Sequence, residues 1–148
     1  MSTDVTVETM VARPRVEVAR YASDWRNDPS WIGGVTEARQ VTDGPFEVGT
    51  QVLRVASFLG RRIEYVTEAV AHEPGSRLAM HAVRGPFPMD VSYEFEDAGE
   101  EATRMRIRAR GDASGFYRLA GPLLARAVKR SIAGDLERLK GLLESSAA

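Results

Sequence analysis

Two segments of strict alternation near the C-terminal end constrain the fold most. Residues 89–96 carry an apolar side chain at every second position and a polar or acidic one between, and residues 103–110 repeat the pattern with four arginines on the polar positions. A period of two is typical of strands with one buried face. The acidic turn at residues 97–100 therefore predicts an antiparallel hairpin with one apolar and one charged face.

Beyond Gly111 the apolar period changes from two to about 3.6 residues, which is typical of a helix. The apolar stripe predicts one amphipathic helix over residues 123–143, with its charged side chains on the opposite face. Gly121-Pro122 lies near its start, so residues 116–120 form either a separate turn or a kinked first segment. The stripe consists of Leu124, Val128, Ile132, Leu136, Leu139 and Leu143.

The earlier part of the chain predicts a first strand, two short helices and a series of strands joined by short turns. Between residues 49 and 72, two long strand-like runs meet at a short connection, Gly60-Arg61. If Leu59 pairs with Arg62, Arg54 lies on the inward, apolar face, and Val55 and Val66 lie on the outward face. The expected ranges are strand 3–10, helices from residue 15 and within 24–31, and strands 35–41, 49–59, 62–72 and 77–83.

These elements together predict an α+β fold with a single domain over residues 1–148. Strands joined by tight turns are antiparallel, and one long apolar helix must cover their shared apolar face. We therefore expect a curved antiparallel sheet of six or seven strands wrapped around the C-terminal helix, with the two short helices after the first strand. Such a curl leaves room for a cavity between the sheet and the helices.

A set of residues and turns occurs in a characteristic order along nearly the whole chain: Asp24, Trp31, Val35, Gly44-Pro45, Val48-Gly49-Thr50, Gly60-Arg61, Glu73-Pro74, Arg77-Leu78, Tyr93-Glu94-Phe95-Glu96, Thr103-Arg104, Asp135-Leu136, Leu139-Lys140 and Leu142-Leu143-Glu144. With the order of elements, this set resembles the helix-grip or START-like superfamily, in its SRPBCC branch of polyketide cyclases, dehydrases and lipid-transport proteins. The resemblance implies a hydrophobic ligand, such as a lipid or polyketide, between sheet and long helix. It implies no universal catalytic residue, so the catalytic residues are left unassigned.

Composition argues against several other classes of protein. The net charge is −1, so no overall field attracts nucleic acid, and no apolar run is long enough for stable membrane insertion. The first ten residues do not have the pattern of a signal peptide, and we expect a cytoplasmic protein, monomeric or homodimeric. No cofactor is indicated, and His72 and His81 lack a third ligand, so no metal is expected.

Arg54 is the most informative candidate for the site, because a buried guanidinium needs an acceptor. Either it binds a ligand carboxylate or carbonyl, with Tyr65 or Tyr93 as a second polar contact, or it pairs with a protein carboxylate. The other candidates are inward-facing residues that either line the pocket or belong to plain core. The full predicted ligand-binding set is Trp31, Arg54, Phe58, Tyr65, Met80, Tyr93, Met105, Ile107, Phe116 and Leu124.

Three functions remain open at this point. The first is binding of a small hydrophobic or aromatic molecule in an internal pocket. The second is a cyclase or dehydratase for polyketide-like substrates, in which Arg54 or a tyrosine stabilises an enolate. The third is a protein-interaction module on the same fold, using the groove or the outward valines.

Overall fold

A computed structural model describes residues 2–145, so the two ends of the expected domain, residue 1 and residues 146–148, lie outside it. The strands are β1 (Thr3–Val11), β2 (Val35–Gln40), β3 (Gln51–Phe58), β4 (Arg61–Glu73), β5 (Arg77–Arg84), β6 (Met89–Asp97) and β7 (Thr103–Gly111). The helices are α1 (Arg15–Ser23), the 3₁₀ turn η1 (Trp25–Asn27), α2 (Asp28–Trp31), α3 (Ser114–Tyr117) and α4 (Gly121–Ser145).

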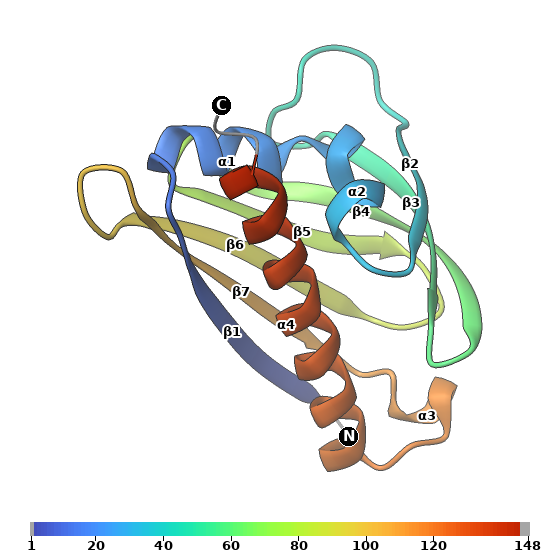
Figure 1. Ribbon diagram of the computed structural model, residues 1–148. Coiled ribbons are helices and arrows are strands. Elements are labelled where there is room, and N and C mark those ends of the chain that lie inside the picture. Colours follow the sequence, from blue (N-terminus) through green and yellow to red (C-terminus); the bar gives the residue numbers. More distant parts are fainter. Residues whose placement is uncertain (1, 146–148) are drawn as a thin grey trace.

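The seven strands form one antiparallel sheet in the order β1-β7-β6-β5-β4-β3-β2. Strands β2 to β7 lie side by side in sequence order, and the first strand, β1, forms the edge of the sheet next to β7. The sheet curves around α4, α1 lies at the end where β1 leads into the helices, and α2 lies near β2 and α4 (Figure 1). The predicted helix-grip fold, with its long C-terminal helix and short helices after the first strand, is thus confirmed.

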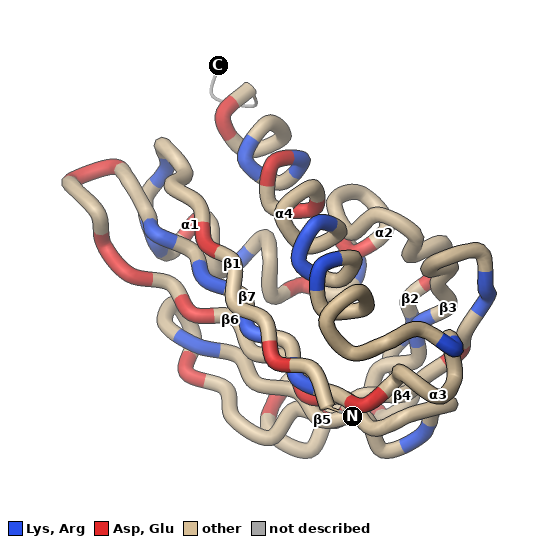
Figure 2. Tube along the Cα trace, turned by 90° about the horizontal axis from the view of Figure 1, so that it is seen from below, with Lys and Arg blue, Asp and Glu red and all other residues tan. Residues whose placement is uncertain are grey.

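The outer face of the β1-β7-β6 region is a ladder of opposite charges. Arg106 lies 3.1 Å from Glu8 and 3.5 Å from Glu96, and Arg108 lies 2.7 Å from Asp4. Acidic and basic positions alternate across this side of the sheet (Figure 2). Opposite charges on neighbouring strands are ordinary sheet stabilisation. Arg106 and Arg108 are therefore neutralised by acidic residues of the adjacent strands.

The β3-β4 hairpin differs from the predicted register by two residues. Its turn is Leu59-Gly60, and Phe58 pairs with Arg61, whereas the sequence suggested a Gly60-Arg61 connection. Both turn residues have positive φ, 51° and 78°, as a two-residue hairpin turn of the I′ class requires. Leucine seldom adopts a positive φ, so a turn that begins at Leu59 is not evident from the sequence. A shift of two keeps each side chain on its face, so Arg54 still points inward.

Val55 and Val66 were expected to lie exposed on the outer face, and that expectation is wrong. They are only 4% and 6% exposed. Val55 lies across from Glu64, and Val66 lies between Leu53 and Arg84, so neighbours larger than valine flank both of them. The pair therefore offers no apolar surface to a partner.

Helix α4 begins at Gly121, and α3 is a separate helical turn before it. Leu124, Leu136, Leu139 and Leu143 are buried on the side of α4 that faces the sheet. The far end of α4 is tied to the segment after β1, where the Ala12 backbone N–H donates to Glu144 at 2.8 Å. No helix within residues 2–145 is long and apolar enough to cross a membrane.

Candidate functional site

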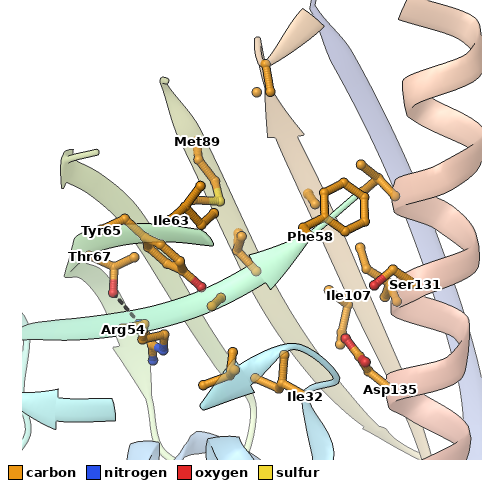
Figure 3. A pocket seen from close by; sticks show the side chains of 18 of the residues that line it. Ile32, Arg54, Phe58, Ile63, Tyr65, Thr67, Met89, Ile107, Ser131 and Asp135 are labelled. Atoms are coloured by element: carbon orange, nitrogen blue, oxygen red, sulfur yellow. Dashed lines mark hydrogen bonds between the residues drawn. The ribbon is translucent and has the colours of Figure 1, made fainter. Parts of the chain in front are cut away.

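A cavity of about 220 Å³ lies between the concave sheet, α4 and the α2-β2 connection. It runs from the buried Arg54 to an aromatic group beside α3, and its walls are mostly apolar (Figure 3). Its lining includes Trp31, Ile32, Val35, Arg54, Ala56, Phe58, Ile63, Tyr65, Thr67, Met80, Phe87, Met89, Val91, Tyr93, Ile107, Ala109, Tyr117, Leu124, Val128, Ser131, Ile132 and Asp135.

Arg54 of β3 is held at one end of the cavity by three neighbours. Its Nε donates to Asp28 Oδ2 at 2.6 Å, its Nη1 donates to Thr67 Oγ1 at 2.6 Å, and its Nη2 lies 3.8 Å from Met80 Sδ. Asp28 is the first residue of α2, so this short helix positions the carboxylate above Arg54 of the sheet. Arg54 therefore pairs with a protein carboxylate, one of the two alternatives that the sequence left open.

Asp28 and Arg54 form a buried ion pair, with side chains 2% and 7% exposed. Burial raises the pKa of Asp28, and the neighbouring guanidinium opposes that rise. Burial disfavours the charged form of Arg54, but the Asp28 carboxylate and nearby phenols outweigh it, so the pKa of Arg54 is raised. Losing either charge would leave the other unpaired in the interior, so the pair stays ionised at neutral pH.

Two tyrosine hydroxyls reach the cavity near this ion pair. Tyr65 and Tyr93 both line it, and neither hydroxyl makes a hydrogen bond within residues 2–145. Burial raises the pKa of both phenols, so they remain neutral donors. Trp31, 1% exposed, packs edge-on against Tyr93 at 5.8 Å, and its indole Nε1 also has no partner among the described residues.

Asp135 brings a carboxylate from α4 into the otherwise apolar wall, where Figure 3 shows it projecting from the helix. Its Oδ1 accepts the Gly33 backbone N–H at 2.7 Å and lies 3.2 Å from Arg138 Nη1. Both hydrogen bonds end on Oδ1, so Oδ2 is unpartnered within residues 2–145. Burial raises the pKa of Asp135 to about 6, against the opposing effects of Gly33 and Arg138.

An aromatic group defines the other end of the cavity, where the β3-β4 hairpin, the β5-β6 connection and α3 meet. Tyr117 packs edge-on against Phe58 at 5.4 Å, and Phe87 lies 5.5 Å from Phe116. The Arg61 guanidinium lies over the Phe116 ring, 3.7 Å from its centroid. These contacts join three separate segments into the end wall of the cavity.

The structure brings eight of the ten predicted site residues together around the cavity: Trp31, Arg54, Phe58, Tyr65, Met80, Tyr93, Ile107 and Leu124. Met105 faces the same side of β7 but is fully buried in the core, away from the cavity. Phe116 stands behind Phe87 and Tyr117, outside the lining.

Three polar side chains of this candidate site, Asp28, Ser131 and Asp135, were not predicted as site residues from the sequence. Asp28 lies in a cluster of turn residues, Asn27-Asp28-Pro29-Ser30, which indicated only a helix start. Asp135 and Ser131 occupy the cavity side of α4, beside Ile132 and Leu136 of the apolar stripe. Two polar residues, four apart, on the inner side of an amphipathic helix were the signal that could have revealed this wall of the site.

The histidines lie away from the cavity. His81 contacts Asp90 at 2.7 Å on the surface, and His72 packs edge-on against Phe46. Within the described part of the chain, no cluster of three metal-ligating side chains occurs. A second hollow of about 550 Å³ lies between α1, η1 and the β2-β3 loop, but its charged rim includes Arg26, already paired with Asp24 at 2.8 Å.

The fold and the cavity together define a helix-grip protein with a largely apolar pocket that carries a few buried polar groups. Residues 2–144 match the family model described as polyketide cyclase/dehydrase and lipid transport, so the chain belongs to this family. The predicted relationship is thereby confirmed. Among curated proteins, none matches the chain.

Solved structures of the same fold cover nearly the whole chain. A START superfamily protein from Mycobacterium smegmatis aligns with a TM-score of 0.85 at 13% identity, covering 97% of this chain and 99% of that one. The Zhui aromatase/cyclase from Streptomyces sp. R1128 aligns with a TM-score of 0.84 at 15% identity, covering 100% and 97% of the two chains. At such identities the likeness concerns the fold alone.

Proposed function

We propose that the protein binds a small hydrophobic or aromatic molecule in the cavity between the sheet and α4. The observation that carries this proposal is the cavity itself, walled by apolar and aromatic side chains from every layer of the fold. Cavities with a few polar groups in an apolar wall are typical of small-molecule sites. The family description, which includes lipid transport, supports the same function.

The cavity volume limits the ligand's size. An apolar protein cavity of roughly 150 Å³ accommodates benzene. A volume of about 220 Å³ therefore suits a body of one or two fused rings or a short acyl segment.

Fluorescence of 1-naphthylamine, an uncharged probe with two fused rings, tests the proposal. We expect enhanced emission on titration with the protein and a saturable signal at one site. Ala109→Phe, which adds a ring inside the cavity, should weaken binding at least tenfold. Ala133→Phe, on α4 but outside the lining, is the matched control and should leave binding unchanged. Equal binding by both variants would show that the probe sits elsewhere.

A second candidate function is cyclisation and dehydration of a polyketide-like chain. Several polar side chains line the mostly apolar cavity, among them Arg54, Tyr65, Tyr93 and Asp135, and a purely passive container does not need all of them. A carboxyl with its pKa near neutrality suits general acid–base work, and neutral phenols can stabilise an enolate. An aromatase/cyclase shares the fold.

In that reaction an enol carbon would form a bond to a ketone carbon while the enol oxygen loses its proton and becomes a carbonyl, and the new alkoxide would take up a proton. The resulting hydroxyl would then leave as water together with a hydrogen from the adjacent carbon. Mass spectrometry of a synthetic diketo thioester incubated with the protein measures the loss of one water. We expect turnover to fall at least a hundredfold in Asp135→Asn while probe binding persists. Wild-type protein that binds the thioester without converting it would exclude this second function.

A further inference from the structure

The charges around the cavity indicate which ligands it accepts, and this inference rests on the binding function proposed above. Among residues 2–145, three charged residues line the cavity: Arg54, Arg110 and Asp135. Arg110 lies at its edge, exposed, and alternates along β7 with Ala109, which faces inward, so its side chain points to the outer face. The charge state of the interior is therefore set by Arg54 and Asp135 with their partners.

Arg54 has its charge and three of its five N–H donors already engaged by protein atoms. Two of its three nitrogens already bind Asp28 and Thr67 at 2.6 Å, and the third contacts Met80 Sδ. Its charge is balanced by Asp28, whose side chain is only 2% exposed. A ligand carboxylate in the cavity would meet a neutralised guanidinium and two protein carboxylates, and burying an uncompensated charge is costly.

Asp135 carries a hydrogen-bond acceptor, Oδ2, that no donor occupies within residues 2–145. Gly33 and Arg138 occupy Oδ1, and Oδ2 has no partner within residues 2–145. Arg138 lies outside the cavity lining with its side chain 47% exposed, so it reaches the carboxylate from the solvent side. A hydroxyl on a ligand is the neutral group that satisfies such an oxygen, through a charge-assisted hydrogen bond.

We propose that the pocket selects uncharged, hydroxyl-bearing aromatic ligands and rejects carboxylates. In this proposal Asp135 Oδ2 accepts a hydrogen bond from the ligand hydroxyl, and Asp28 neutralises the charge of Arg54 that would otherwise attract an anion. The unpartnered hydroxyls of Tyr65 and Tyr93, among the described residues, remain as donors for a second oxygen, such as a carbonyl on the same ring system. A phenolic ketone is thus the ligand class that can donate to Asp135 and accept from Tyr65 or Tyr93 at the same time. Specificity of this kind comes as much from the repulsion of a ligand carboxylate as from the hydrogen bond to a ligand hydroxyl.

Three naphthalenes of nearly equal size separate the effects: 2-naphthol, 2-methoxynaphthalene and 2-naphthoate. Each is titrated at pH 7.5 against protein loaded with 1-naphthylamine, and displacement of this probe gives its affinity. We expect the naphthol to bind at least tenfold more tightly than the methoxy compound, which lacks the donor. The naphthoate should bind most weakly of the three.

Asp135→Asn tests the assignment to one residue. The amide can still accept the Gly33 N–H, but the charged acceptor is gone, so the preference for naphthol over methoxynaphthalene should fall below about threefold. Binding of naphthoate should improve in the same variant. Glu137→Gln removes the same charge from an exposed position of α4 and should leave all three affinities unchanged.

The outcomes separate this inference from the binding function. Naphthoate binding as tightly as naphthol to the wild-type protein would overturn the charge selection alone, because the probe still reports an occupied pocket. An unchanged preference in Asp135→Asn would equally overturn it. Failure of the probe and of every naphthalene to bind would overturn both proposals.

Discussion

At the scale of single residues, the buried ion pair between Arg54 and Asp28 is a feature whose disruption should be costly. Both side chains are almost fully buried, and their shortest contact is 2.6 Å. Replacing Arg54 by methionine leaves Asp28 as an uncompensated buried charge. We expect Arg54→Met to lower the free energy of unfolding by about 3–5 kcal/mol, measured by urea denaturation.

The double variant Arg54→Met/Asp28→Asn is the control for that prediction. It removes both charges, so it should be more stable than Arg54→Met alone, although it carries one more substitution. If the second substitution costs further stability, the single variant's loss comes from packing and not from the unpaired charge.

Asp135 predicts an unusual dependence of stability on pH. Its pKa is raised from 3.8 unfolded to about 6 folded, so between these values the folded protein binds more protons than the unfolded chain. Asp135 therefore contributes most to stability below about pH 4 and progressively less as the pH rises through 6. Because asparagine does not titrate, Tm(Asp135→Asn) minus Tm(wild type) should be larger at pH 7.5 than at pH 4.5.

Tm is measured by thermal unfolding of both proteins at several pH values between 4.5 and 7.5. Taking the difference in Tm removes the effects of titrating groups that the two proteins share. A difference in Tm that stays flat across the range would show that Asp135 titrates at its ordinary value.

At the scale of elements, two glycines test how the α2-β2 connection and α4 are built. Gly34 has φ of 91°, and a Cβ there would overlap the Ser57 carbonyl oxygen of β3. Gly134 lies exposed in the middle of α4, and apart from its chain neighbours and the backbone of its own helix, a Cβ at this position would meet no described atom within 4 Å. Gly34→Ala should therefore cost about 1–3 kcal/mol of stability.

Gly134→Ala is the matched substitution and should gain about 0.5–1 kcal/mol, because alanine loses less backbone entropy in a helix. Urea denaturation of each variant measures these changes in the free energy of unfolding. A loss in both variants would mean that α4 needs glycine for a reason other than helix formation.

At the scale of the whole molecule, ligand binding should stabilise the fold globally, because the cavity is walled by the sheet and by α4 together. A ligand at a hundred times its Kd adds about 2.7 kcal/mol to the free energy of unfolding. For a chain of this size that corresponds to a rise in Tm of about 5–10 °C. Thermal scans over a series of naphthol concentrations measure the rise, and a Tm independent of concentration would contradict it.

Much of the fold could be predicted because its signals are local. Alternation in residues 89–96 and 103–110 and the helical stripe of α4 depend only on near neighbours in sequence. The faces of the strands followed from the same period, so Arg54 was assigned inward correctly even though the β3-β4 register was wrong by two residues. Most of the predicted pocket residues lie together for this reason.

Local patterns in the chain were thus enough to specify the sheet, the long helix and the side of each that faces inward. The partners of the buried polar groups were set by tertiary packing instead. Arg54 and Asp28 are 26 positions apart, and Gly33 and Asp135 are 102 apart. Whether such groups meet depends on how the sheet curls and where α2 and α4 rest on it. Those are long-range packing outcomes that no local period encodes.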